Sequence, residues 1–140
     1  MISIRKRVQD LVLGSTLLAS TLLTGTGCAV NPTTGQRQFM LVSESEEIAM
    51  GREADGPITE SFGLYESEAL RTMVSNLGNE MASGSEGPAL PWSFKLADDP
   101  MVNAFALPGG FIFITRGIMA ALNSEAELAG VISHEIGHVT

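Results

Sequence analysis

The chain has two histidines, His134 and His138, which stand four residues apart with Glu135 directly after the first. In an α-helix this H-E-x-x-H spacing puts the two imidazoles about 40° apart on one face and about 6 Å apart along the axis. Both side chains can therefore reach one Zn²⁺, whose bonds to imidazole nitrogen are about 2.0–2.1 Å long. Glu135 projects about 100° from His134, which suits a general base that takes a proton from water. A purely structural pair of histidines is the alternative.

The residues around the motif predict a helix that is buried along one side and continues to the end of the sequence. Asn123 or Ser124 is expected to cap it, and Ser124 with Glu127 forms a capping-box pattern. Gly130 and Gly137 each destabilise a helix interior by about 1 kcal/mol, so we expect a packing reason for both. The predicted apolar face consists of Leu128, Val131, Ile132, Ile136 and Val139.

Two further helices are predicted earlier in the chain. Ser43 and Glu46 form a capping box that opens the first helix, and the Asp55-Gly56-Pro57 run is expected to end it. The second helix is expected to end at residues 83–85, where serine flanks a glycine. Its apolar stripe, at helical spacing, consists of Leu70, Met73, Val74, Leu77 and Met81.

Short strands are predicted at residues 39–42, 92–97, 101–107 and 111–115. Apolar and polar residues alternate through the second of these, as in a strand buried on one face. A Pro-Gly-Gly turn at residues 108–110 joins the last two strands into a hairpin. Helices and strands in this order predict an α+β fold.

The first 27 residues have the features of an export signal. Arg5, Lys6 and Arg7 precede an uncharged apolar or small-residue run at 11–23, and Gly25-Thr26-Gly27 leads into Cys28. This order predicts a lipoprotein signal peptide at residues 1–27, with Cys28 as the lipidated first residue of the mature chain. An uncleaved anchor helix, or an ordinary cleaved signal followed by a spare cysteine, remains open.

The charge balance excludes a general nucleic-acid binder, because the formal net charge is -8. Beyond residue 27 only 5 basic residues remain against 15 acidic ones. The single cysteine also excludes an intrachain disulfide framework.

Several stretches together resemble the gluzincin zinc metallopeptidases of family forty-eight, the family of HtpX and the CAAX prenyl proteases. The H-E-x-x-H helix and residues 103–117, from Asn103-Ala104-Phe105 to Arg116-Gly117, are similar to its active helix and to the strand-turn-strand before it. Residues 31–38 and Ser43-Glu44 resemble the opening of the exported lipoprotein branch, which includes BepA and LoiP. The resemblance covers nearly all of residues 31–140.

The resemblance implies a zincin-like metallopeptidase domain over residues 28–140 and a zinc endopeptidase with one Zn²⁺ per subunit. It also implies a role in envelope quality control, with unfolded or misassembled envelope proteins as substrates. The protein would then lie at the periplasmic side of a membrane, as an outer-membrane lipoprotein. In this fold an extended substrate pairs with an edge strand, which would place Asn103, Ala104 and Phe105 against the substrate. A plain core hairpin is the alternative for these residues.

The family takes its third zinc ligand from a glutamate on a later helix, whereas this sequence ends two residues after His138. We therefore expect that the chain is the N-terminal part of a longer enzyme, and that the 140 residues alone are inactive. The other hypothesis is a non-catalytic, membrane-tethered binding protein with an incomplete, vestigial zinc site.

Overall fold

The computed structural model describes residues 28–30, 37–39, 42–85 and 89–140. The predicted signal peptide and residues 31–36 lie outside these ranges. Strand β1 (Cys28–Val30) pairs antiparallel with β2 (Arg37–Phe39). Phe39 of the strand predicted at residues 39–42 therefore lies in β2, whereas residues 40 and 41 lie outside the described ranges. None of the described helices is both long and apolar enough to cross a membrane.

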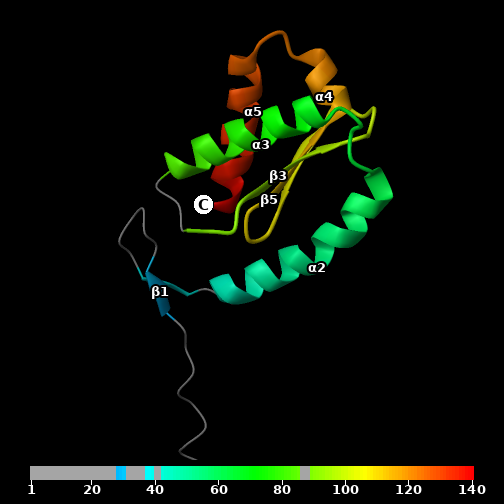
Figure 1. Ribbon diagram of the computed structural model, residues 1–140. Helices are drawn as coiled ribbons and strands as arrows, with labels where there is room; N and C mark the ends of the chain where they lie inside the picture. Colours follow the sequence, from blue (N-terminus) through cyan, green and yellow to red (C-terminus); the bar gives the residue numbers. More distant parts are fainter. Residues whose placement is uncertain (1–27, 31–36, 40–41, 86–88) are drawn as a thin grey trace, which may run out of the picture.

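The main sheet has three strands in the order β3-β5-β4 (Figure 1). Strand β3 (Ser93–Ala97) runs parallel to β5 (Phe111–Thr115), and β4 (Ala104–Leu107) runs antiparallel to β5. The predicted hairpin is therefore confirmed. Its turn places Gly109 and Gly110 at φ values of 75° and 94°, a region that favours glycine.

Strand β4 begins three residues later than predicted. Met101 and Val102 form a bend before it, where the Asp99 carboxylate accepts a hydrogen bond from the Met101 amide at 2.7 Å. A side chain that binds its own backbone two residues on is typical of a turn, and this one replaces the first part of the predicted strand.

Helix α2 (Glu44–Phe62) begins at the predicted capping box but does not end at Pro57. Its middle is fixed to the sheet instead. The Lys95 ammonium of β3 lies 2.6 Å from both carboxylate oxygens of Asp55 and 2.9 Å from the Thr59 hydroxyl. Asp55 precedes the proline and Thr59 follows it, so Lys95 binds the helix on both sides of Pro57. These tertiary contacts outweigh the hydrogen bond that proline removes, and the helix ends only at Gly63.

The other helices agree with the sequence to different degrees. Helix α3 (Glu68–Ser83) ends where it was predicted to end and contains the whole predicted apolar stripe. Helix α4 (Arg116–Ala121) was not predicted, and it starts directly after β5 with Thr115 as its N-cap. Helix α5 (Glu125–Val139) is capped by Ser124, while the Glu127 carboxylate binds the Asn123 amide rather than that of the cap.

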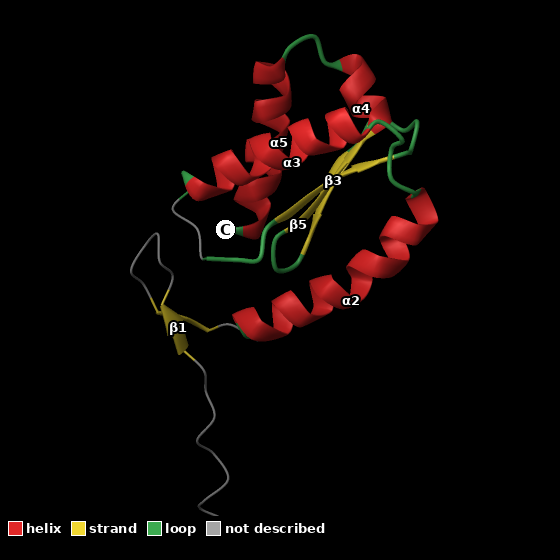
Figure 2. Cartoon of the chain, in the orientation of Figure 1, coloured by secondary structure: helices red, strands yellow, loops and turns green. Residues whose placement is uncertain are grey.

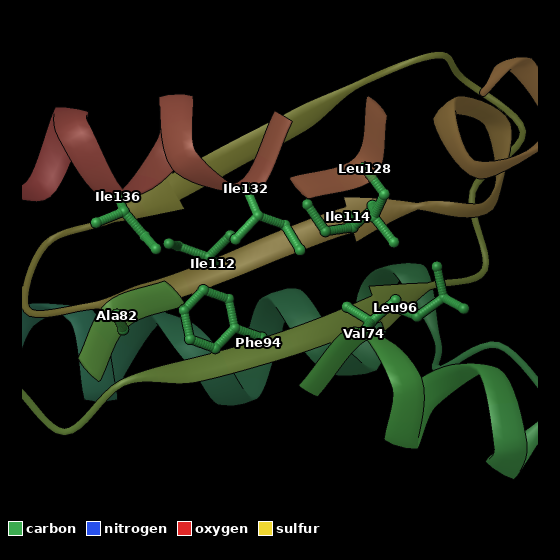
Figure 3. Packing of buried hydrophobic residues seen from close by; sticks show 9 residues of the cluster. All are labelled: Val74, Ala82, Phe94, Leu96, Ile112, Ile114, Leu128, Ile132 and Ile136. Atoms are coloured by element: carbon green, nitrogen blue, oxygen red, sulfur yellow. The ribbon is translucent and has the colours of Figure 1, made fainter. Parts of the chain in front are cut away.

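The three longer helices cover the two faces of the sheet (Figure 2). Helices α3 and α5 pack together on one face, and α2 lies on the other. Between α3, α5 and the sheet is the core, in which α5 presents Leu128, Ile132 and Ile136 to Ile112 and Ile114 of β5 (Figure 3). Burial of each such side chain contributes about 1.5–3 kcal/mol, and it fixes the rotation of α5 about its axis. Mixed helices on a small sheet agree with the predicted α+β class.

Candidate functional site

Helix α5 brings His134 and His138 together at the surface. Their Nε2 atoms are 3.0 Å apart, and the rings meet edge to face with centroids 4.5 Å apart. Both residues are exposed, because the apolar side of the helix faces the core and the histidines lie away from it. The i, i+4 spacing thus produces two convergent imidazoles that point to one location.

The separation of the two nitrogens fits one zinc ion. Two nitrogens bound tetrahedrally to Zn²⁺ at 2.0–2.1 Å would lie roughly 3.3 Å apart, close to the observed distance. A direct hydrogen bond between two neutral imidazoles would use a similar arrangement. Within the described ranges no group of three histidine, cysteine, aspartate or glutamate side chains could hold a metal, so two candidate ligands are in place here.

Glu135 lies beside this pair and differs from it in burial. It is 8% exposed, whereas its two histidine neighbours are exposed. Nevertheless Glu135 is one of the residues that line an open groove together with His134. The residue is therefore nearly buried and at the same time part of the groove wall.

The groove runs between β4, α4 and α5 and has a volume of about 570 Å³. Helix α5 contributes Glu127, Gly130, Val131, His134 and Glu135 to it. The opposite walls come from Ile118 and Leu122 around α4, and from Val102, Asn103 and Ala104 at the start of β4.

Two of the three residues predicted to face a substrate line this groove, and the third does not. Asn103 and Ala104 lie in its wall, whereas the Phe105 ring stacks on Phe113 at 5.1 Å and contacts Phe62 at 5.9 Å. These aromatic partners lie on the α2 side of the sheet, because successive strand residues face opposite ways. The predicted pairing of residues 103–105 with a substrate uses backbone groups, so this ring placement leaves it a prediction.

Thr115 holds the walls of the groove in position. It is 3% exposed, and its hydroxyl lies 2.6 Å from the Met101 carbonyl and 2.7 Å from the Asn103 carbonyl. The same oxygen accepts hydrogen bonds from the amides of Asn103 and Ile118, both at 3.2 Å. One side chain thus connects the start of β4 with the first turn of α4.

The profile of Peptidase family M48 matches residues 68–140, which is more than half of the chain. The chain belongs to peptidase family M48. The match begins at the first residue of α3 and includes the three-stranded sheet, the groove and both histidines.

Named M48-type relatives agree with this assignment. The Beta-barrel assembly-enhancing protease of Yersinia pestis is 30% identical over 138 residues, which cover 90% of this chain and 28% of the relative. The Mitochondrial metalloendopeptidase OMA1 of Schizosaccharomyces pombe is 30% identical over 118 residues, or 76% of this chain and 33% of that protein. The Escherichia coli Beta-barrel assembly-enhancing protease is 28% identical over 109 residues, 78% of this chain and 22% of its own length. The chain therefore spans about a quarter to a third of these relatives.

Some residues of this M48 site could not be found from the sequence. Ile118 and Leu122 enter the groove because α4 folds back beside α5, and the apolar pattern alone carries no such signal. Thr115 looks like the last residue of a strand. Its hydroxyl also contacts the carbonyls of Met101 and Asn103, which are far away in sequence.

Proposed function

We propose that this protein is a zinc-dependent metalloendopeptidase whose site is built on α5. The observation that carries the proposal is the pair of imidazole nitrogens 3.0 Å apart, beside a nearly buried glutamate in an open groove. Membership of family M48 supports the same function, because the H-E-x-x-H arrangement combines ligands and a base on one helix.

Each residue has a distinct task in this proposal. His134 and His138 would hold the ion, and the family resemblance implies a glutamate on a later helix as the third protein ligand. A bound Zn²⁺ would supply Lewis acidity, which lowers the pKa of water and polarises a peptide carbonyl. Glu135 accepts the proton of the attacking water on its carboxylate and then delivers it to the leaving amine. Its burial shields that proton transfer from bulk solvent.

The substrate would be held as an extra strand. Strand β4 is at one edge of the three-stranded sheet, with β5 on its inner side. Backbone amides and carbonyls from Asn103 to Phe105 can pair with an extended peptide along the free edge. This pairing would place a peptide bond next to His134 and Glu135, since Ala104 lies across the groove from both.

The cell envelope is the proposed location. The signal pattern at residues 1–27 and the lipidation pattern at Cys28 support export and a lipid anchor, with residues 28–140 as part of the peptidase domain. Two of the relatives are named for enhancing β-barrel assembly. We therefore infer that unfolded or misassembled envelope proteins are the substrates.

Cleavage by the full-length protein tests the function. Glu135→Gln keeps the shape of the side chain but cannot accept a proton, so cleavage of an unfolded outer-membrane protein should fall by about 10²–10⁴-fold. Ser133→Ala is the matched control, because Ser133 is exposed on the same helix and lies outside the groove. Equal cleavage by Glu135→Gln and the parent would exclude a general-base role.

The anchor has its own test. Intact mass of the protein extracted from membranes should correspond to a chain that begins at Cys28 and carries acyl groups. Cys28→Ser should remove that mass and release the protein from the membrane fraction. An unmodified Cys28, or a start at another residue, would contradict the lipoprotein proposal.

A non-catalytic, membrane-tethered binding protein is the second candidate. It would hold an extended peptide in the same open groove beside His134, without chemistry at Glu135. A binding protein would retain unfolded envelope proteins without cleaving them, and Glu135→Gln would then change nothing in the cleavage test.

A further inference from the structure

The groove is apolar along its length and acidic at the end farthest from the histidines. Glu127, Val131 and His134 lie on one stripe of α5, since residues four and seven apart share a face. Glu127 is two turns from His134, which is about 10 Å along the axis. Across the groove are the aliphatic side chains of Ile118 and Leu122.

Gly130 keeps this space open. A Cβ at this position would meet nothing within 4 Å, so close packing does not explain the glycine among the described residues. Among the described residues, the expected packing reason is found for neither Gly130 nor Gly137, because a Cβ at either would meet open space there. A glycine inside a helix destabilises it by about 1 kcal/mol. At Gly130 the missing side chain leaves the floor of the groove unobstructed between Glu127 and His134.

Glu127 is available to a cation at the acidic end. Its Oε2 accepts hydrogen bonds from the Asn123 amide at 2.7 Å and from Asn123 Nδ2 at 3.4 Å. The ion pairs found in the part of the chain that the structure describes join Lys95 to Asp55 and Arg116 to Asp98, so no described cation neutralises Glu127. No lysine or arginine lines the groove.

We propose that the groove selects substrates with a lysine or arginine next to the scissile bond. This inference rests on the proposed peptidase function and names the class of substrate. The methylene stem of such a side chain packs on Val131, Ile118 and Leu122, and its charged head reaches the Glu127 carboxylate. A two-turn distance from His134 suits a long side chain rather than a short one.

Peptide binding tests this without requiring turnover. The probes are fluorescent peptides that differ only at the residues flanking one central bond, with Lys, Arg, Leu or Glu there. The protein is the full-length Glu135→Gln variant, in which a peptide is retained. We expect Lys and Arg peptides to bind about tenfold more tightly than the Leu peptide. Adding Glu127→Gln should reduce this preference to less than threefold, and adding Glu125→Gln should leave it unchanged, because Glu125 is exposed in the same first turn and outside the groove.

Gly130→Leu provides a second variant that does not depend on charge. It should fill the floor and weaken binding of the Lys, Arg and Leu peptides alike by about tenfold, while α5 keeps its fold because leucine favours helix more than glycine does. A Leu peptide that binds as tightly as the Lys peptide, equal effects of Glu127→Gln and Glu125→Gln, or no peptide binding would each overturn the inference.

The two proposals fail in different ways. If the parent protein cleaves unfolded proteins but Glu127→Gln does not alter the preference, the peptidase function stands and the groove inference is wrong. If the parent cleaves nothing while Lys peptides bind through Glu127, the inference stands for a binding protein and the peptidase function is wrong.

Discussion

Replacing Thr115 by Val should loosen the substrate side of the site, because the hydroxyl is replaced by a methyl group of similar size. The hydroxyl has one proton and two lone pairs, so it makes at most three of its four contacts at once. Without it, the amides of Asn103 and Ile118 lose their acceptor and the Met101 carbonyl loses a donor. The Asn103 carbonyl keeps the Thr115 amide at 3.2 Å.

The magnitude follows from counting those groups. A buried polar group without a partner destabilises the fold by about 1–3 kcal/mol. Met101 is 65% exposed, so water can replace the hydroxyl at its carbonyl, and two amides remain. We therefore expect Thr115→Val to lower the local opening free energy by about 2–6 kcal/mol, which is about 1–3 kcal/mol for each amide. Thr115→Ser keeps the hydroxyl and loses one buried methyl, for about 1 kcal/mol.

Hydrogen exchange on the full-length protein measures this difference. Protection of the amides at residues 103–122 should fall about 30- to 20,000-fold in Thr115→Val and only about fivefold in Thr115→Ser, since 1.4 kcal/mol corresponds to a factor of ten. Equal losses in the two variants would mean that the methyl group, not the hydroxyl, matters. Protection within threefold of the parent in Thr115→Val would refute the role of the hydrogen-bond network.

Three further perturbations test the packing of the fold. Gly78→Ala should destabilise the protein by about 1–3 kcal/mol in urea unfolding, because the new Cβ would lie 2.2 Å from the Phe94 ring; an unchanged midpoint would contradict this packing. A double-mutant cycle of Lys95→Met and Asp55→Asn should give a coupling of about 0.5–3 kcal/mol, whereas additive effects would show that the ion pair does not fasten α2 to the sheet. The Ser43 hydroxyl and, to a smaller extent, the Ser43 amide donate hydrogen bonds to the Glu46 carboxylate at the cap of α2 and so lower its pKa. The stabilisation of the fold by this cap should therefore be complete above the ordinary pKa of 4.5 and be lost as the pH falls through the lower pKa of the folded state. A Glu46 titration midpoint at or above 4.5, measured by NMR, would contradict this cap.

The elements with a strong local pattern were predictable from the sequence. In β3 the alternation of apolar and polar residues coincides with the burial of Phe94 and Leu96. In α3 the apolar stripe includes Val74, which is completely buried. Local preference and tertiary packing agree in these segments, so either one alone predicts the element.

Elements that depend on distant contacts were not predictable. Helix α2 passes through Pro57 because Lys95 of β3 holds the turn before it and the turn after it. Gly51 of the same helix lies against the Pro108 carbonyl, where a Cβ would clash. Neither partner is visible in the local sequence around the proline, which on its own signals a helix end.

The candidate site shows the same division. The convergence of His134 and His138 follows from helix geometry, which the spacing alone determines. The groove needs three separate elements and could not be predicted. The side of the sheet on which each β4 side chain lies was predictable, because strand period places Ala104 and Phe105 on opposite faces.

Zinc content of the full-length protein and its variants tests the central claim most directly. Purified parent protein should hold one zinc per chain, and His134→Ala or His138→Ala should lose both zinc and cleavage, since each removes one imidazole ligand. Glu135→Gln should keep zinc at the parental level and lose cleavage, because it removes only the base. Full zinc content in both histidine variants would show that the imidazoles are paired by a hydrogen bond and hold no metal. Loss of zinc from Glu135→Gln would show that the glutamate supports the ion, and the division of tasks on α5 would be wrong.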